Sequence, residues 1–438
     1  MPLLIIASGI LLLLLLTVKF KLNAFISFIV VSIYVGLALG ISMNDIITSI
    51  QNGIGSTLGF LVLILGLGAM LGKLIAESGA AQRITTKLVS VFGLKYIQWA
   101  LMLTGFIVGI PMFYSVGFVM MIPLVFTIAV ATELPLLYVG LPMLASLSVT
   151  HGYLPPHPAP SAIATIFGAN IGKTLIYGII VAIPAIIVAG PLFSRLVKKI
   201  EAKPLKEFYN PVVLKDEELP KMWVSILTAL LPVLLIVVST LAEQFMNTES
   251  LFVQILVFLG NPVMAMLIAV LVAIFTLGLR RGKSMKAVME SLAGSVSSIT
   301  MVLLVIAGAG ALKQVLIDSG AGDYIGKVAA DSGLSPLILA WTIATLLRVS
   351  IGSATVAGLT TAGILLPVLS QGNVSAELMV LAIGSGSLML SHVNDSGFWL
   401  FKEYFNLSVK DTISSWTVME TTVGVMGLLG VLVLDMFI

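Results

Sequence analysis

Long apolar stretches separated by short polar connections run along almost the whole chain. A helix needs about 20 apolar residues to cross a membrane, and most of these stretches reach that length. The alternation expected of a membrane β-barrel is absent from the sequence. Because backbone groups in lipid must be bonded within a helix or a closed barrel, the pattern predicts an all-α integral membrane protein. The apolar blocks are 2–18, 23–40, 54–76, 97–132, 136–168 and 172–194, then 222–243, 251–279, 293–317, 336–371, 376–407 and 412–437.

A polar stretch between residues 195 and 221, with seven Lys/Arg and five Asp/Glu, divides the apolar blocks into two equal sets. Sequence landmarks recur across it in the same order, at separations of 238 to 244 positions. They are 66–84 with 308–325, 146–151 with 387–392, Trp99 with Trp341, Pro123 with Pro367, and Asn23 with Asn261. The pattern predicts two repeats, 1–194 and 222–438, joined by a cytoplasmic linker, 195–221.

Two blocks, 97–132 and 336–371, are too long for one crossing and too short for two. Small residues, polar residues or proline occupy their middles, so we expect re-entrant hairpins, which membranes tolerate where protein or water covers them. We expect a broken helix in each of the blocks 136–168 and 376–407. Each half then has five crossings, and the odd number inverts the second half, as in many secondary transporters.

The positive charges predict the orientation, because cytoplasmic loops are rich in Lys and Arg. With the N-terminus outside, 19 of the 23 Lys and Arg residues fall on or near the cytoplasmic side. Both termini are therefore predicted to be periplasmic, in a multi-pass protein of the bacterial inner membrane. The N-terminal stretch lacks a basic leader and a cleavage site, so we interpret it as a retained helix.

Composition excludes several function classes. Hydrophobic residues make up 59% of the chain and charged residues 10%, against about 25% charged in soluble domains. With no cysteine, the chain has no disulfide, no cysteine-bound zinc and no thiol nucleophile. No basic cluster with interleaved aromatic residues suggests a nucleic-acid partner.

All three histidines lie where the two halves are interrupted at equivalent positions. His151 and His157 lie in the proline-rich stretch 150–160, and His392 lies in 391–397. Proline removes a backbone donor and clashes with the preceding helical turn, whereas an Asn-Asp-Ser-Gly sequence stops one helix and caps the next. Broken helices expose N-termini near the middle of the membrane, where they suit an anion, and paired interruptions mark transporter binding sites.

The hairpin tips and the two breaks together give the predicted site. The substrate-binding candidates are Ser115, Thr150, His151, His157, Arg348, Gly352, Ser353, Thr355, Ser391, His392, Asn394 and Asp395. The proton-coupling candidates are His151, His157, Asp395 and Glu420. Structural roles stay open, because a buried His or Asn is as often a helix–helix hydrogen-bond partner. Arg348 could bind a substrate carboxylate or pair with Asp395 or Glu420, and Glu420 could make a structural hydrogen bond. Glu77 and Asp318 are interpreted as solvated helix ends.

Other function classes fit the sequence less well. Residues 320–323 spell the GxGD pattern of intramembrane aspartyl proteases, but the Tyr-Asp pair of that chemistry is absent. His151 and His157 do not have a helical ligand spacing and HExxH is missing, so we expect no metal and no cofactor. A channel is compatible with the composition, but paired breaks in inverted repeats favour a carrier.

Three longer motifs carry a family resemblance: SVTHGYLPPHPAPSAIATIFGANIGKTLIYG (148–178), LRVSIGSATVAG (347–358) and SHVNDSGFWLFKEYFNL (391–407). With the rest of the chain, they closely resemble the gluconate permease family of bacterial sugar-acid:proton symporters. The resemblance implies import of gluconate or a close sugar acid with protons, D-serine or glycerate being alternatives within that family. The wider ion-transporter superfamily implies inverted repeats, an elevator-like movement and a homodimer.

One departure from the family pattern lies at the first hairpin tip. The family usually has Tyr/Phe-x-Glu-Val-Gly there, whereas this chain has Ser115 in place of the glutamate. The resemblance then implies either a different substrate or proton coupling through another group, such as His151, His157 or Asp395.

Overall fold

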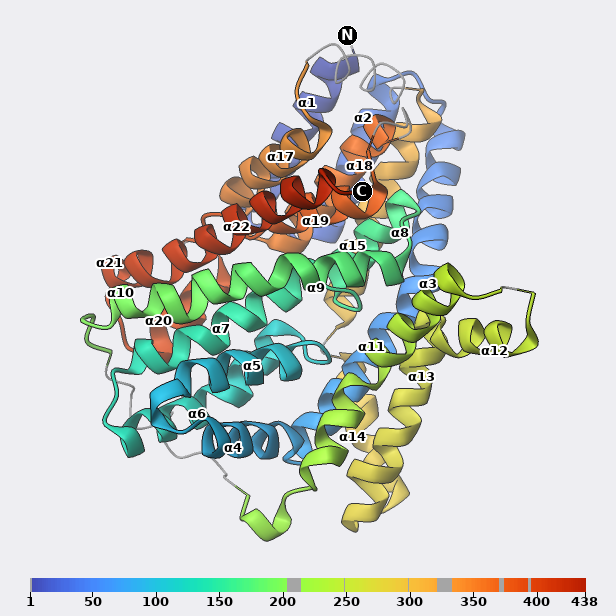
Figure 1. The fold of residues 1–438 in the computed structure, drawn as a ribbon. Helices are drawn as coiled ribbons and strands as arrows, with labels where there is room; N and C mark the ends of the chain where they lie inside the picture. Colours follow the sequence, from blue (N-terminus) through green and yellow to red (C-terminus); the bar gives the residue numbers. More distant parts are fainter. Residues whose placement is uncertain are drawn as a thin grey trace.

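The computed structural model describes residues 2–202, 214–247, 249–297, 299–320, 333–369, 374–392 and 395–438. Within these ranges every regular element is a helix (Figure 1). The helices pack around a large apolar core, and many large apolar side chains also face outward. The prediction of an all-helical membrane protein is confirmed.

The helices of the first half are α1 (Pro2–Leu14), α2 (Ala24–Ala38), α3 (Met43–Glu77), α4 (Ala80–Phe92), α5 (Ile97–Gly109), α6 (Tyr114–Thr132), α7 (Leu136–Tyr153), α8 (Pro158–Phe167), α9 (Ile171–Ile187) and α10 (Phe193–Val197). Those of the second half are α11 (Met222–Phe245), α12 (Leu251–Gly260), α13 (Pro262–Ala273), α14 (Met285–Ser297), α15 (Thr300–Asp318), α17 (Pro336–Ile351), α18 (Ala354–Leu369), α19 (Ala376–Gly386), α20 (Ser396–Tyr404), α21 (Val409–Thr412) and α22 (Val418–Asp435).

Two predicted apolar blocks have different boundaries in the structure. The block 54–76 belongs to the longer helix α3, which begins at Met43 because the Ser42 side chain caps it by accepting from the backbone N–H of Asp45. The block 251–279 is divided at Asn261, whose side chain accepts from the N–H of Val263. Pro262 has no N–H, so it can begin α13 but cannot extend α12.

Several features recur in the two halves. Asn23 caps α2 as Asn261 caps α13, at a separation of 238 positions. Helices with equivalent places in the two halves pack against each other: α3 against α15, α7 against α19, and α9 against α22. Figure 1 shows α9 and α22 side by side. These features support the predicted repeat.

Two polar contacts are reciprocal between the halves. Glu77, at the end of α3, accepts from Ser291 of α14 at 2.8 Å, and Asp318, at the end of α15, accepts from Ser49 of α3 at 2.5 Å. Equivalent residues thus exchange equivalent bonds, as expected around a twofold axis. Glu77 and Asp318 are exposed residues at helix ends, as interpreted from the sequence, and their carboxylates in addition bond to neighbouring helices.

Four helical stretches of the described chain are long and apolar enough to cross a membrane: Ile171–Val197, Met222–Glu243, Pro262–Arg281 and Val409–Asp435. Two bent pairs, Met43–Gly59 with Leu61–Glu77 and Ala80–Phe92 with Leu94–Gly109, raise this number to six when each counts as one span. Most other apolar helices are shorter because turns interrupt the predicted blocks. The ten crossings and two re-entrant hairpins stay a prediction.

The described part of the linker is fastened to the beginning of α4. The Gln82 carboxamide donates to the carbonyl of Leu214 at 2.8 Å and accepts from its N–H at 3.1 Å. The Arg83 guanidinium donates to the carbonyls of Asp216 and Pro220 and pairs with the Asp216 carboxylate at 2.6 Å. This linker clamp fixes the segment 214–220 against the first half.

Replacing Arg83 by Ala is expected to increase trypsin cleavage after Lys215 about tenfold, since each charge-assisted hydrogen bond lost is worth about 1.5–3 kcal/mol. Quantitative mass spectrometry of the linker peptides measures the rate in the reconstituted protein. Lys87→Ala, an exposed residue on the same helix, is the matched control. Equal cleavage rates in both variants would contradict the importance of the clamp.

Candidate functional site

The first interruption lies between α7 and α8. The chain leaves the helix after Tyr153, at Pro155 and Pro156, and His157 is the N-cap of α8. The imidazole Nε2 of His157 lies 2.8 Å from the carbonyl oxygen of Gly109, the last residue of α5. His151, in the last turn of α7, holds its ring 5.3 Å from that of His157. The break therefore brings two imidazoles together at the end of the first hairpin helix.

The second interruption lies between α19 and α20. Asp395 caps α20, with Oδ1 accepting from the N–H of Gly397 at 2.9 Å. Its Oδ2 accepts from the Ser391 hydroxyl and from the Arg348 guanidinium, which also donates to the carbonyl of Gly352. Arg348 is only 4% exposed. Of the alternatives that the sequence left open, the structure has Arg348 paired with Asp395.

The remaining predicted residues lie close to these elements. Ser353 accepts from the N–H of Val356 at 3.3 Å, Thr355 is half-buried at the start of α18, and His392 Nε2 lies 3.1 Å from the carbonyl of Val349. Thr150 donates to the carbonyl of Leu147 at 3.0 Å. The Ser115 side chain, Asn394, and the part of the GxGD sequence beyond Gly320 lie outside the described residues.

Two aromatic residues that the sequence did not single out connect the two breaks. The Tyr114 ring lies 6.1 Å from the His151 ring and 5.9 Å from the Trp416 ring, measured between centroids. The Trp416 indole N–H donates to the Ser391 hydroxyl at 2.8 Å. A continuous path of contacts therefore runs from the first-half histidines to the Arg348–Asp395 pair.

The sequence gives no signal for Trp416 and a weak one for Tyr114. Trp416 belongs to a turn of π-helix, a feature common at functional sites but without a sequence signature. Tyr114 is next to the predicted Ser115 at the hairpin tip, so its position was a usable signal.

The helix N-termini differ from the expected anion-binding ends. The N-terminus of α20 is occupied by the carboxylate of Asp395. In α8, Pro158 and Pro160 have no N–H to offer, so Ala159 carries the only free donor of the first three residues. The N-terminus of α6, by contrast, has no side-chain cap, since its N-cap is Phe113. This end lies beside His157, whose ring centroid is 6.4 Å from that of Phe113.

Glu420 connects α22 to α7 within the same region. Its Oε2 accepts from the Ser148 hydroxyl at 2.8 Å, and the residue is 2% exposed. Electrostatic interactions also connect it with Arg348 and Asp395. Glu420 therefore makes the structural hydrogen bond that the sequence allowed, and one carboxyl oxygen stays unbonded.

Buried polar atoms without a hydrogen-bond partner concentrate at this place. Five of the seven in the described part of the chain belong to Tyr114, His151, His157, Arg348 and Glu420. Native proteins leave few such atoms, because each costs about 1–3 kcal/mol. We call these five residues, together with Ser391, Asp395 and Trp416, the polar cluster. It is a surface of unused donors and acceptors that suits a polar ligand.

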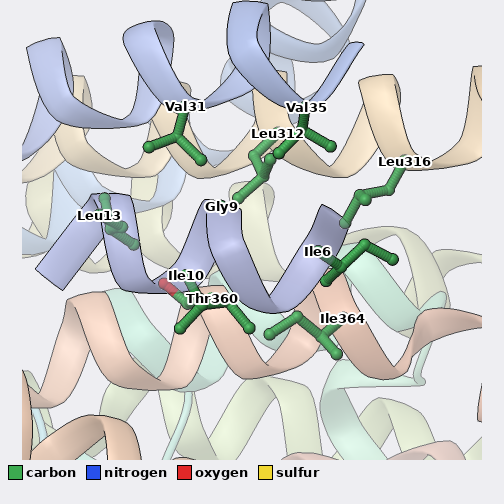
Figure 2. Close-up of a pocket in the computed structure, with 10 residues that line it drawn as sticks. All are labelled: Ile6, Gly9, Ile10, Leu13, Val31, Val35, Leu312, Leu316, Thr360 and Ile364. Atoms are coloured by element: carbon green, nitrogen blue, oxygen red, sulfur yellow. The ribbon is translucent and has the colours of Figure 1, made fainter. Parts of the chain in front are cut away.

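A cavity elsewhere in the molecule has the opposite character. It lies between α1, α2, α15 and α18, and Figure 2 shows apolar side chains around it. The one polar residue of its lining, Thr360, donates to the carbonyl of Val356 at 2.8 Å. A cavity with this lining offers no hydrogen-bond partners to a charged or polyhydroxylated ligand.

Comparisons with known proteins identify the family. The model of the GntP family permeases matches residues 1–437. The chain is 54% identical to the high-affinity gluconate transporter of Escherichia coli K12 over 439 residues, covering 100% of both chains. It is 53% identical to the Gnt-II system L-idonate transporter of the same organism, covering 99% of both chains, and 48% identical to the gluconate permease of Bacillus subtilis 168, covering 100% of both.

Solved structures of two transporters share the fold at 16% identity. The YdaH transporter of Alcanivorax borkumensis gives a TM-score of 0.64, covering 94% of this chain and 96% of that one. MtrF of Neisseria gonorrhoeae gives 0.62, covering 94% and 93%. At this identity the likeness establishes the architecture alone. The full-length family match establishes more: the chain belongs to the GntP family of permeases and is a multi-pass membrane transporter, not an enzyme.

Proposed function

We propose that this permease imports gluconate or a close sugar acid, such as idonate, across the bacterial inner membrane together with protons. The observation that carries the proposal is the polar cluster, where unused donors and acceptors gather between interrupted helices. Gluconate carries one carboxylate and a row of hydroxyls. Its binding site therefore needs positive potential at one end and a mixture of hydrogen-bond donors and acceptors along the rest. Relatives that share about half of the sequence bear the names of gluconate and idonate transporters.

The positive potential would come from the uncapped N-terminus of α6 and from Arg348. A carboxylate that binds Arg348 shares it with Asp395, whose oxygens already accept three hydrogen bonds. The hydroxyl groups of the substrate would be bound by the histidines and by the small polar residues. In this proposal these are Ser115, Thr150, His151, His157, Ser353, Thr355, Ser391, His392 and Asn394, while Gly352 lets the backbone approach.

The proton is proposed to bind in the first half. Asp395 already serves as a cap and an ion-pair partner, so its oxygens are occupied. His151 and His157 each keep a buried Nδ1 without a partner, and histidine is the usual side chain for proton exchange near neutral pH. Glu420, with one unbonded oxygen, is the alternative carrier.

The predicted inverted repeats, periplasmic termini, elevator-like movement and homodimer belong to the same proposal. Reciprocal contacts between the halves support the repeat. Because most of the polar cluster is buried, a substrate reaches it only after the interrupted elements separate from their neighbours. Movement of the hairpins with the broken helices against the rest would provide that access.

Labelled gluconate uptake into proteoliposomes with an imposed pH gradient tests the proposal. We expect His151→Asn with His157→Asn to abolish uphill accumulation, whereas gluconate exchange persists at equal concentrations high enough to offset the weaker binding, because exchange needs no net proton movement. A protonophore should produce the same loss in the unmodified protein. If the double variant still accumulates gluconate in response to pH, the histidines are not the carriers and Glu420→Gln is tested next. Preference for D-serine or glycerate over gluconate in competition would overturn the substrate assignment.

A further inference from the structure

Tyr114 occupies a position in the polar cluster that no structural role explains. It is the first residue of α6, and its ring contacts the rings of His151, Trp416 and Phe118. The ring is therefore held by residues of both halves. Its hydroxyl is buried and has no hydrogen-bond partner.

Two carboxyl groups interact electrostatically with this hydroxyl but do not form a hydrogen bond with it. Electrostatic interactions connect it with the carboxyl groups of Glu420 and Asp395, on α22 and at the start of α20. Neither is hydrogen-bonded to the Tyr114 hydroxyl, and Glu420 keeps its own unbonded oxygen. A ligand group that both donates and accepts, as an alcohol does, would satisfy the hydroxyl and a neighbouring acceptor together.

A second buried tyrosine provides the contrast. Tyr153, at the end of α7, is fully buried and donates its hydroxyl to the carbonyl of Val423 at 2.5 Å. This hydroxyl fastens α7 to α22 and is the usual state of a buried phenol. The hydroxyl of Tyr153 thus has a hydrogen-bond partner within the protein, whereas that of Tyr114 has none.

We infer that Tyr114 is a substrate-binding residue whose hydroxyl binds one alcohol group of the sugar acid. The inference deepens the proposed function and rests on it. A site built to bond a substrate hydroxyl rejects an analogue that lacks it, because the protein's own polar group then stays buried without a partner. Tyr114 would therefore contribute to selectivity between polyhydroxylated acids and less hydroxylated ones.

The experiment compares Tyr114→Phe with Tyr153→Phe in the full-length purified protein. Each variant loses one buried hydroxyl and nothing else. Thermal unfolding without substrate measures the structural role, and isothermal titration with gluconate measures binding. For Tyr114→Phe we expect an unchanged or higher Tm and a gluconate affinity lower by about fivefold to tenfold, the equivalent of one hydrogen bond. For Tyr153→Phe we expect a lower Tm and an unchanged affinity.

A panel of deoxy analogues of gluconate identifies the alcohol group concerned. For one analogue, the unmodified protein and Tyr114→Phe should bind equally well, because the bond is already missing. A fall in Tm for Tyr114→Phe, or gluconate affinity equal to that of the unmodified protein, would overturn the inference while leaving the proposed function intact. Absence of gluconate binding to the unmodified protein would instead overturn the proposed function, and this inference with it.

Discussion

Replacing Arg348 by Met is expected to abolish uptake and to lower the free energy of unfolding by about 3–5 kcal/mol. Arg348 is the cationic partner of Asp395, and both are largely buried, at 4% and 12% exposure. Without the guanidinium, Asp395 keeps only the Ser391 hydroxyl and the N–H of Gly397, and the carbonyl of Gly352 loses its donor. Thermal unfolding in detergent and uptake in proteoliposomes measure the two effects.

A double replacement separates the structural part of this effect from the functional part. The desolvation penalty of a buried ion pair is about as large as the attraction between its charges. Arg348→Met with Asp395→Leu should therefore recover much of the stability but none of the uptake. The control is Glu403→Gln, which breaks the more exposed pair with Lys402 and should cost about 0–1 kcal/mol. Full uptake by the double variant would contradict a role of the pair in transport.

Replacing Gly384 by Ala is expected to prevent correct packing of the two broken helices. A Cβ atom at Gly384 would lie 2.4 Å from the carbonyl oxygen of Gly152, across the contact of α19 with α7. The obstacle is backbone on the neighbouring helix, so a side-chain rotation cannot relieve it. Overpacking of this kind costs about 1–3 kcal/mol. Size-exclusion chromatography of the expressed protein and its Tm measure the outcome.

Gly55→Ala is the matched control for this change. Gly55 lies inside α3, away from its bend, and a Cβ there would meet no atom within 4 Å. Alanine should therefore stabilise the helix by up to about 1 kcal/mol. If the Gly384→Ala protein has the yield and Tm of the unmodified protein, the contact between Gly384 and the carbonyl of Gly152 does not limit the packing of α19 against α7, and the prediction is wrong.

The sequence predicts the helices well where a covalent property decides the structure. The prolines at 155 and 156 mark the end of α7, and Asp395 caps the start of α20. The end of α19 at Gly386 was not predicted, because it comes well before the Asn-Asp-Ser-Gly stretch that was expected to stop the helix. The early start of α3 was missed because residues 43–53 are partly polar, and their place in a helix depends on the Ser42 cap and on packing against α15. The division at Asn261 had a visible signal in Pro262.

The site was predictable only as a set of segments. Sequence locates the interruptions, but which side chains meet depends on how four distant segments pack. The sequence left three partners open for Arg348, and only the fold brings Asp395 to it. Tyr114 and Trp416 look like ordinary apolar residues in the sequence, because an aromatic side chain in a membrane helix is usually a packing element. Their importance follows from the unbonded hydroxyl and the indole donor, both tertiary features.

The pairing of Arg348 with Asp395 also has a consequence for the response to membrane voltage. The two charges cancel, so this pair carries no net charge through the membrane field. If a histidine carries one proton with each gluconate anion and Glu420 stays protonated, the empty and the loaded site are both neutral, and voltage affects neither direction of movement. If Glu420 carries the proton, both forms have one negative charge, and each direction depends on voltage by up to about 2.3 kcal/mol per 100 mV, although the complete cycle moves no net charge.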